Sequence, residues 1–156
     1  MLAPPFPVSF DCSLLGWCHV QIAYSRKYIR LYVKKQGEDF VTINRIDVGA
    51  RLSKVVIHGD TVYLAGLTAD KTAGQSVGAQ TQEILAAIDA LLAKAGTDKS
   101  KLLQATIWLQ DIRTVDEMNK VWDAWVPSGC APARACIEAR LQSPAKMVEI
   151  RVTAAR

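Results

Sequence analysis

The sequence lacks a long apolar run and a strong excess of charge of either sign. Its 156 residues include 19 basic and 15 acidic ones, which gives a formal net charge of +4. Residues 1–40 hold five basic and three acidic residues, so 1–40 and 41–156 each carry an excess of two positive charges. A nucleic-acid interface normally clusters Lys and Arg on one face, whereas residues 41–156 intersperse both signs. This pattern disfavours nucleic acid as a direct partner.

The most apolar stretch near the N-terminus, residues 14–24, is too short to cross a bilayer. No Lys or Arg precedes it, and no small-residue cleavage pattern follows it, as a secretory signal would require. We therefore expect a cytoplasmic protein without a membrane partner.

The four cysteines, at positions 12, 18, 130 and 136, form no familiar metal-binding pattern. Structural zinc sites usually use the shorter C-x2-C or C-x4-C spacing. A site made of Cys12, Cys18 and His19 is the one metal alternative. Separate reduced thiols and no bound metal are favoured, because cytosolic redox buffers keep most thiols reduced.

The chain has enough apolar residues for one ordinary core but hardly for two full domains. Residues 1–40 begin with three prolines and show no clean periodicity, although residues 28–33 (YIRLYV) have the composition of a strand. We expect an N-terminal extension, 1–40, and one domain, 41–156. Because GUG valine codons can start translation, residues 1–40 could also be an over-extended gene assignment that should begin at Val41. The intact mass of protein made from its own locus tests that hypothesis.

From residue 53 onward the sequence predicts regular elements. Residues 53–58 and 61–65 are rich in β-branched residues and flank Gly59-Asp60, which predicts a β-hairpin. Residues 43–47 are a possible additional leading strand. Apolar residues at three-, four- and seven-residue separations predict a helix over 76–95 that ends in a left-handed cap at Gly96. A second helix is expected to begin at Thr114 in a capping box with Glu117.

Three further strands are predicted at 101–109, 133–141 and 147–154, with the odd-numbered residues 103–109 on one buried face. The order β-β-α-β-α-β-β is typical of an α+β domain with a single mixed β-sheet and both helices on one face. The other face of such a sheet would expose a large apolar surface. Self-association into a closed ring is the expected way to cover it.

The segment 133–138 is the densest candidate for chemistry. Strand alternation puts Arg134, Cys136 and Glu138 on one face. If this strand forms a hairpin with the last one, a register that places Arg134 opposite Glu149 also places Cys136 opposite Met147. A guanidinium can bind a small carboxylate through two parallel hydrogen bonds, and a glutamate can orient or deprotonate a water. A solvated surface ion pair between the two residues is the alternative interpretation.

The run APARACIEARL, followed after a short loop by VEIRVTAA, resembles the C-terminal signature of the Rid (YjgF-type) family. The segments QEILAAIDALLAKAG, KLLQATIWLQD and MNKVWDAW resemble that family's first helix, third strand and second helix. The similarity covers about residues 41–156. The segment VWDAWV and an R-x-S near the start are similar to the YoaB-like branch of the family.

The resemblance implies a chorismate-mutase-like fold and a homotrimer with clefts between subunits. It implies hydrolysis of the imine or enamine of a 2-oxo acid to the oxo acid and ammonia, without a cofactor or metal. Arg134 matches the residue that holds the substrate carboxylate, and Glu149 the one that positions the water. The remaining matches are neighbours of the substrate-binding site: Cys136 lines the pocket, Asn119 comes from the second helix, and Arg51 and Ser53 lie near where the cleft begins.

Two departures from the family pattern leave a second function open. Ala65-Gly66-Leu67 stands where better-known deaminases carry S-G-Q, and their tyrosine of the first strand region falls near Leu52. The chain could therefore be a module that binds a small carboxylate such as a 2-oxo acid for regulation, without turnover. Hydrolysis remains the favoured function, because an imine beside a carboxylate needs little more than positioning and a water.

Overall fold

The computed structural model describes residues 18–25, 28–35 and 42–156, and the chain divides into two compact units, Met1–Phe40 and Val41–Arg156. In the first unit, β1 (Cys18–Ser25) and β2 (Tyr28–Lys35) form an antiparallel hairpin in which Cys18 pairs with Lys35. The strand expected at 28–33 is part of β2. Cys12 and Val41, on which the metal alternative and the start-site hypothesis rest, lie outside the described residues.

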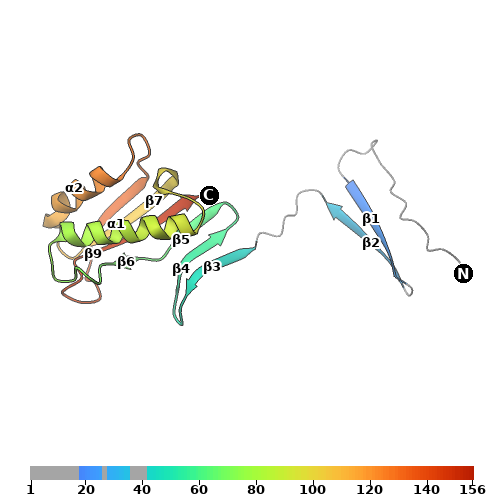
Figure 1. Ribbon diagram of the computed structural model, residues 1–156, viewed down its shortest axis with the longest axis horizontal. Coiled ribbons are helices and arrows are strands. Elements are labelled where there is room, and N and C mark those ends of the chain that lie inside the picture. Colours follow the sequence, from blue (N-terminus) through green and yellow to red (C-terminus); the bar gives the residue numbers. More distant parts are fainter. Residues whose placement is uncertain (1–17, 26–27, 36–41) are drawn as a thin grey trace, which may run out of the picture. The chain divides into compact units, whose positions relative to one another are not determined.

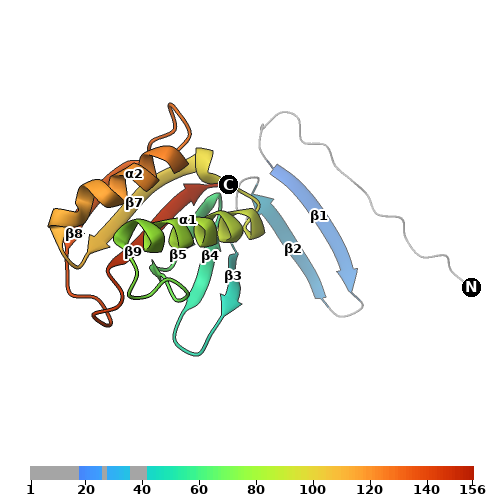
Figure 2. The ribbon, with the colours of Figure 1, turned by 60° about the vertical axis from the view of Figure 1, so that its left-hand side comes forward.

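The second unit is one mixed sheet with two helices on one face, as the sequence predicted (Figures 1 and 2). Its strand order is β3-β4-β5-β9-β7-β8, with β6 also paired to β9. Every pairing is antiparallel except that of β7 with β8. The elements are β3 (Ile43–Val48), β4 (Ser53–His58), β5 (Thr61–Leu64), β6 (Leu67–Thr68), α1 (Val77–Lys94), β7 (Leu102–Leu109), α2 (Val115–Trp125), β8 (Ala133–Glu138) and β9 (Val148–Ala155), with short 3-10 turns at Lys99–Lys101 and Ile112–Thr114.

Local signals placed the hairpin and the first helix correctly. The turn between β4 and β5 has Gly59 at a φ of 58°, a conformation that glycine adopts without steric cost. Ser76 caps α1 by accepting a hydrogen bond from the Ala79 amide at 3.2 Å. Gly96, at a φ of 77°, follows the end of the helix as predicted.

The predicted capping box at the start of α2 is wrong. The Thr114 side chain makes no capping bond to α2; its hydroxyl donates to the Asp111 carbonyl at 2.7 Å. The chain enters α2 directly from the 3-10 turn, so Thr114 has φ −89° and ψ 8° rather than the extended backbone of a capping residue. The Glu117 carboxylate instead accepts a hydrogen bond from the Gly78 amide at 2.8 Å, and so caps the first turn of α1.

The core lies between the sheet and the helices. Alternate residues of the central strands are fully buried there, for example Ile107 on β7 and Ile150 on β9, with Ile88 of α1. Leu103 was expected on the same face but is 50% exposed, because the register shifts between Leu102 and Gln104.

The opposite face of the sheet carries exposed apolar side chains. Tyr63 alternates with buried Val62 and Leu64, and 47% of its surface is exposed. Ile137 pairs with Trp108 on the same face and is also 47% exposed. Within 18–25, 28–35 and 42–156, no helix has the length and apolar character needed to cross a membrane.

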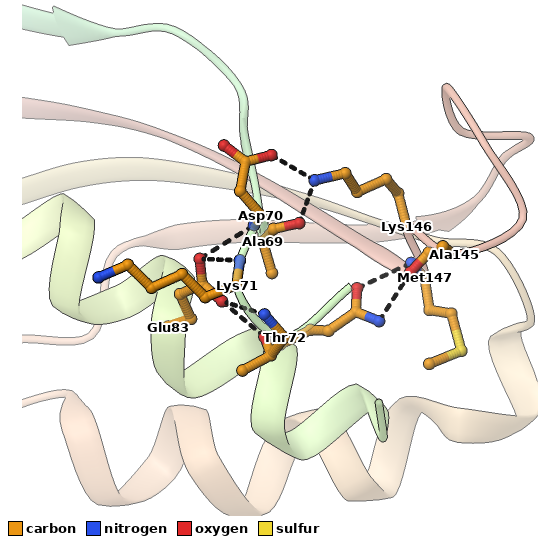
Figure 3. A network of polar contacts seen from close by, with 9 residues as sticks. Ala69, Asp70, Lys71, Thr72, Glu83, Ala145, Lys146 and Met147 are labelled. Atoms are coloured by element: carbon orange, nitrogen blue, oxygen red, sulfur yellow. Dashed lines mark hydrogen bonds and ion pairs between the residues drawn. The ribbon is translucent and has the colours of Figure 1, made fainter. Parts of the chain in front are cut away.

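A polar network centred on α1 fixes the two loops beside β6 and β9 (Figure 3). The Glu83 carboxylate accepts hydrogen bonds from the amides of Asp70, Lys71 and Thr72 and from the Thr72 hydroxyl, at 2.7–3.0 Å. Lys146 donates to the Ala69 carbonyl and pairs with the Asp70 carboxylate at 2.5 Å. These contacts join residues 69–72 to the segment that leads into β9.

Gln80 joins the same loops from within the protein, because its side chain is fully buried. Its amide nitrogen donates to the Ala145 carbonyl at 2.9 Å, and its oxygen accepts from the Met147 amide at 2.9 Å. Both polar atoms of the side chain are therefore satisfied, as buried amides require. Helix α1 thus positions the strands β6 and β9 relative to each other.

We expect the stability of the domain to fall in acid because of Glu83. The hydrogen bonds from Thr72, Lys71 and Asp70 lower the pKa of this carboxyl from 4.5 to about 2. A depressed folded-state pKa contributes stability that is complete above pH 4.5 and is lost as the pH falls toward 2. As the pH is lowered across this range, the melting temperature of wild type should fall more steeply than that of Glu83→Gln. Thr72→Val removes one donor and should give an intermediate slope, whereas parallel curves would contradict this account.

Candidate functional site

Arg134 projects from the edge strand β8 toward helix α2. It pairs with Ala105 of β7, whose side chain is buried under the helices, so both side chains point to the helix-covered face. Its Nη1 donates to the Asn119 side-chain oxygen at 3.0 Å. Its guanidinium carbon lies 5.3 Å from the centre of the Trp122 ring. The predicted neighbours Arg134 and Asn119 are therefore in contact.

Cys136 lies on the same face as Arg134, two residues along β8, and is half-buried. Burial raises the pKa of its thiol, and the positive charge of Arg134 offsets part of that rise. The thiol is therefore protonated at neutral pH, which suits a wall of a pocket and does not suit a nucleophile. Glu138, the third residue of this face, accepts a hydrogen bond from the Ile112 amide at 3.0 Å and so supports the turn before α2.

Glu149 lies on the uncovered face of the sheet. It pairs with Trp108 of β7 and with Thr68 of β6, and it alternates with the buried Val148 and Ile150. Its carboxylate occupies the space beside Gly66, because a Cβ added at Gly66 would stand 2.0 Å from Glu149 Oε1. Glycine at position 66 is thus required for this placement of the carboxylate.

The last two strands do not form the hairpin that the sequence analysis considered. Strand β7 lies between β8 and β9, and Arg134 and Glu149 of one chain project from opposite faces of the sheet. Helix α2 carries the chain from β7 to a parallel position at the sheet edge, which leaves the place between β5 and β7 for β9. The two side chains consequently do not meet within one chain.

The other two predicted site neighbours, Arg51 and Ser53, lie near the opposite end of the strand order from β8. Ser53 begins β4, where it pairs with Val48, and Arg51 lies exposed in the turn before it. In the described part of the chain, no hydrogen bond or ion pair joins them to the other candidate residues. Their place near a cleft stays a prediction.

Sequence reasoning missed Trp122 and Gly66 as parts of the site. Trp122 is only 4% exposed and belongs to the core, yet its ring also supports Arg134. The available signal was its spacing, since residues three apart on a helix share a face and Trp122 follows Asn119 by three. A second stack, Arg151 over Trp108 at 5.6 Å, lies on the uncovered face with Glu149.

Comparison with known proteins identifies the fold and its relatives. A family model described as endoribonuclease L-PSP matches residues 42–156. The chain is 47% identical over 115 residues to the RutC family protein YoaB of Escherichia coli (strain K12), covering 74% of this chain and 99% of that protein. The chain belongs to the YjgF/Rid family. The resemblance noted in the sequence is therefore confirmed.

Other members of the YjgF/Rid family agree. A RutC family protein of Haemophilus influenzae (strain ATCC 51907 / DSM 11121 / KW20 / Rd) is 44% identical over 114 residues, which are 73% of this chain and 98% of that protein. The crystal structure of NMB1025 from Neisseria meningitidis, a YjgF family member, has 42% identity and a TM-score of 0.68 over 74% of this chain and 96% of that one. The crystal structure of an uncharacterized protein from Pseudomonas aeruginosa has 41% identity and a TM-score of 0.71, and the match covers 74% of this chain and 99% of that one.

The raised pKa of Cys136 predicts slow alkylation at neutral pH. Iodoacetamide labelling, with peptide mass mapping to distinguish the cysteines, should modify Cys136 only as the solution becomes alkaline, because the thiolate is the reactive form. Arg134→Gln removes the nearby charge and should move this onset to higher pH. Arg134→Lys keeps a positive charge and serves as the control. Rapid labelling of Cys136 at neutral pH would refute the assignment.

Proposed function

We propose that the protein hydrolyses reactive 2-imino or enamine acids to 2-oxo acids and ammonia in clefts between subunits of a homotrimer. Membership of the YjgF/Rid family supports an imine-hydrolysing, small-molecule role in general. The observation that carries the specific proposal is the placement of Arg134. Its guanidinium is exposed at a sheet edge and held by Asn119 and Trp122, so it is pre-oriented to bind a small carboxylate.

Glu149 is the proposed water-activating group. In this mechanism Arg134 binds the substrate carboxylate, and the Glu149 carboxylate accepts a proton while the water oxygen attacks the imine carbon. Glu149 passes this proton to the nitrogen, which gives a carbinolamine. The hydroxyl proton of the carbinolamine is then transferred through Glu149 to the nitrogen, the C–N bond breaks, and ammonia leaves as the C=O bond of the 2-oxo acid forms. No metal or organic cofactor is needed for these steps.

The opposite orientations of these two side chains support a cleft between subunits. Arg134 stands on the edge strand β8, whereas Glu149 lies on the uncovered face that carries the exposed Tyr63 and Ile137. A neighbouring subunit that packs on this face covers its apolar surface. We propose that it also brings its own Arg134 to Glu149, with Cys136 at the wall of the cleft.

A non-catalytic function is supported by the two departures from the family pattern, Ala65 at the serine position and Leu52 near the tyrosine position. In that case the same cleft would bind a 2-oxo acid for regulation. RNA cleavage, which the description of the family model names, fits less well, because residues 41–156 intersperse acidic and basic side chains.

The first test measures release of ammonia from 2-iminopropanoate generated in situ by an amino acid oxidase. Wild type should accelerate release above the buffer rate. Glu149→Gln should lower kcat by about 100-fold, as expected for loss of a general base. Arg134→Ala should raise KM by about 10- to 100-fold through loss of charged hydrogen bonds. No acceleration by wild type, with 2-oxo acid binding that Arg134→Ala abolishes, would favour the regulatory function.

The second test asks whether the site is shared between chains. Arg134→Ala and Glu149→Gln proteins are denatured together and refolded as mixed trimers. A cleft is intact where a Glu149→Gln chain supplies Arg134 and an Arg134→Ala chain supplies Glu149, so random mixing should restore about a quarter of wild-type activity. Each variant refolded alone is the control. Mixed trimers no more active than these controls would contradict a shared cleft.

A further inference from the structure

The indole ring of Trp122 stacks against the guanidinium of Arg134. Only 4% of this side chain is exposed, and the Arg134 guanidinium carbon lies 5.3 Å from the centre of its ring. A cation over an aromatic face is attracted by the ring's quadrupole, and tryptophan gives the strongest such attraction. The contact therefore favours one position of a long side chain that is otherwise exposed.

The ring is itself held in place by α1. Trp122 packs against Trp125, with ring centres 5.4 Å apart and planes tilted by 55°. The Trp125 indole nitrogen donates to the Asp89 carboxylate at 2.9 Å. A continuous set of contacts thus runs from α1 through both tryptophans of α2 to the guanidinium on β8.

The hydrogen bond to Asn119 leaves most of the guanidinium available. The group has five N–H donors, of which the Asn119 side chain engages one on Nη1. Enough donors remain for two parallel hydrogen bonds to a carboxylate. Among the salt bridges of the described residues, none involves Arg134, so no acidic side chain there competes for these donors.

We propose that Trp122 is a positioning residue, which holds Arg134 by a cation–π stack so that the guanidinium fork faces the carboxylate of the substrate. Trp122 then determines affinity for the carboxylate without touching the substrate. The inference rests on the proposed function of Arg134 as the carboxylate anchor.

The test compares Trp122→Leu and Trp122→Phe with wild type. Calorimetric or NMR titrations measure the affinity for pyruvate, which has a carboxylate, and for its uncharged methyl ester. Trp122→Leu should weaken pyruvate binding about two- to fivefold, the range expected for a partly exposed cation–π contact, and leave ester binding unchanged. Trp122→Phe keeps an aromatic ring, so its pyruvate affinity should lie between those of wild type and Trp122→Leu. In turnover, KM should rise by a similar factor while kcat is retained.

A structural control separates this role from core packing. Met118 is fully buried on the same helix, and Met118→Ala removes apolar volume without removing the stack. It should lower the melting temperature and leave the ratio of pyruvate to ester affinity at the wild-type value. If Trp122→Leu unfolds the domain, Trp122→Phe provides the test, because its ratio of pyruvate affinity to ester affinity should still fall below that of wild type.

Failure of this inference is distinguishable from failure of the proposed function. If Arg134→Ala abolishes pyruvate binding but the folded Trp122 variants keep the wild-type ratio, Trp122 is not a positioning residue and Arg134 remains the anchor. If Arg134→Ala also binds pyruvate like wild type, the anchor assignment itself is wrong.

Discussion

The pairing of β7 with both β8 and β9 decides where the two candidate catalytic side chains lie. Arg134 pairs with Ala105 of β7 and Glu149 pairs with Trp108, so each side chain lies on the same face of the sheet as its partner. Strand alternation places residues 105 and 108 on opposite faces. One chain therefore offers a guanidinium at the sheet edge under α2 and a carboxylate on the uncovered face. The hydrolysis proposed here consequently depends on association, because the two groups can meet only when chains combine.

The surroundings of each group are built differently. Arg134 is supported by side chains of α2, which offer an amide oxygen and an indole face. Glu149 is placed by backbone shape: β6 pairs beside it, and the absence of a side chain at Gly66 leaves room for the carboxylate. The loops on both sides are tied to α1 through Glu83 and Gln80. The guanidinium is thus fixed by side-chain contacts, whereas the carboxylate depends on the fold around β6 and β9 and on the missing side chain of Gly66.

Local rules predicted the elements well and their order in space poorly. The Gly59 turn and the Ser76 cap each depend on a few neighbouring residues, so the sequence reveals them directly. Strand order depends on competition between distant segments. The short loop between the predicted strands 133–141 and 147–154 favoured a hairpin, but β8 ends at Glu138 and β9 begins at Val148, so the connection is longer. The predicted capping role of Glu117 was wrong for the same reason, because its hydrogen-bond partner is the Gly78 amide, which is remote in sequence. Arg134 and Asn119 were identified as neighbours only through family resemblance.

The departures from the family pattern affect the proposed site unequally. Leu67 pairs with Ile150 and packs against the core, so the leucine at this position does not face the side of the sheet where Glu149 lies. Gly66, by contrast, is retained from the S-G-Q pattern and is the residue whose missing side chain Glu149 requires. Ala65 offers no hydroxyl at the serine position. The proposed hydrolysis depends mostly on holding the acid and delivering a water, so it relies on Arg134 and Glu149 and not on the serine and tyrosine that this chain lacks.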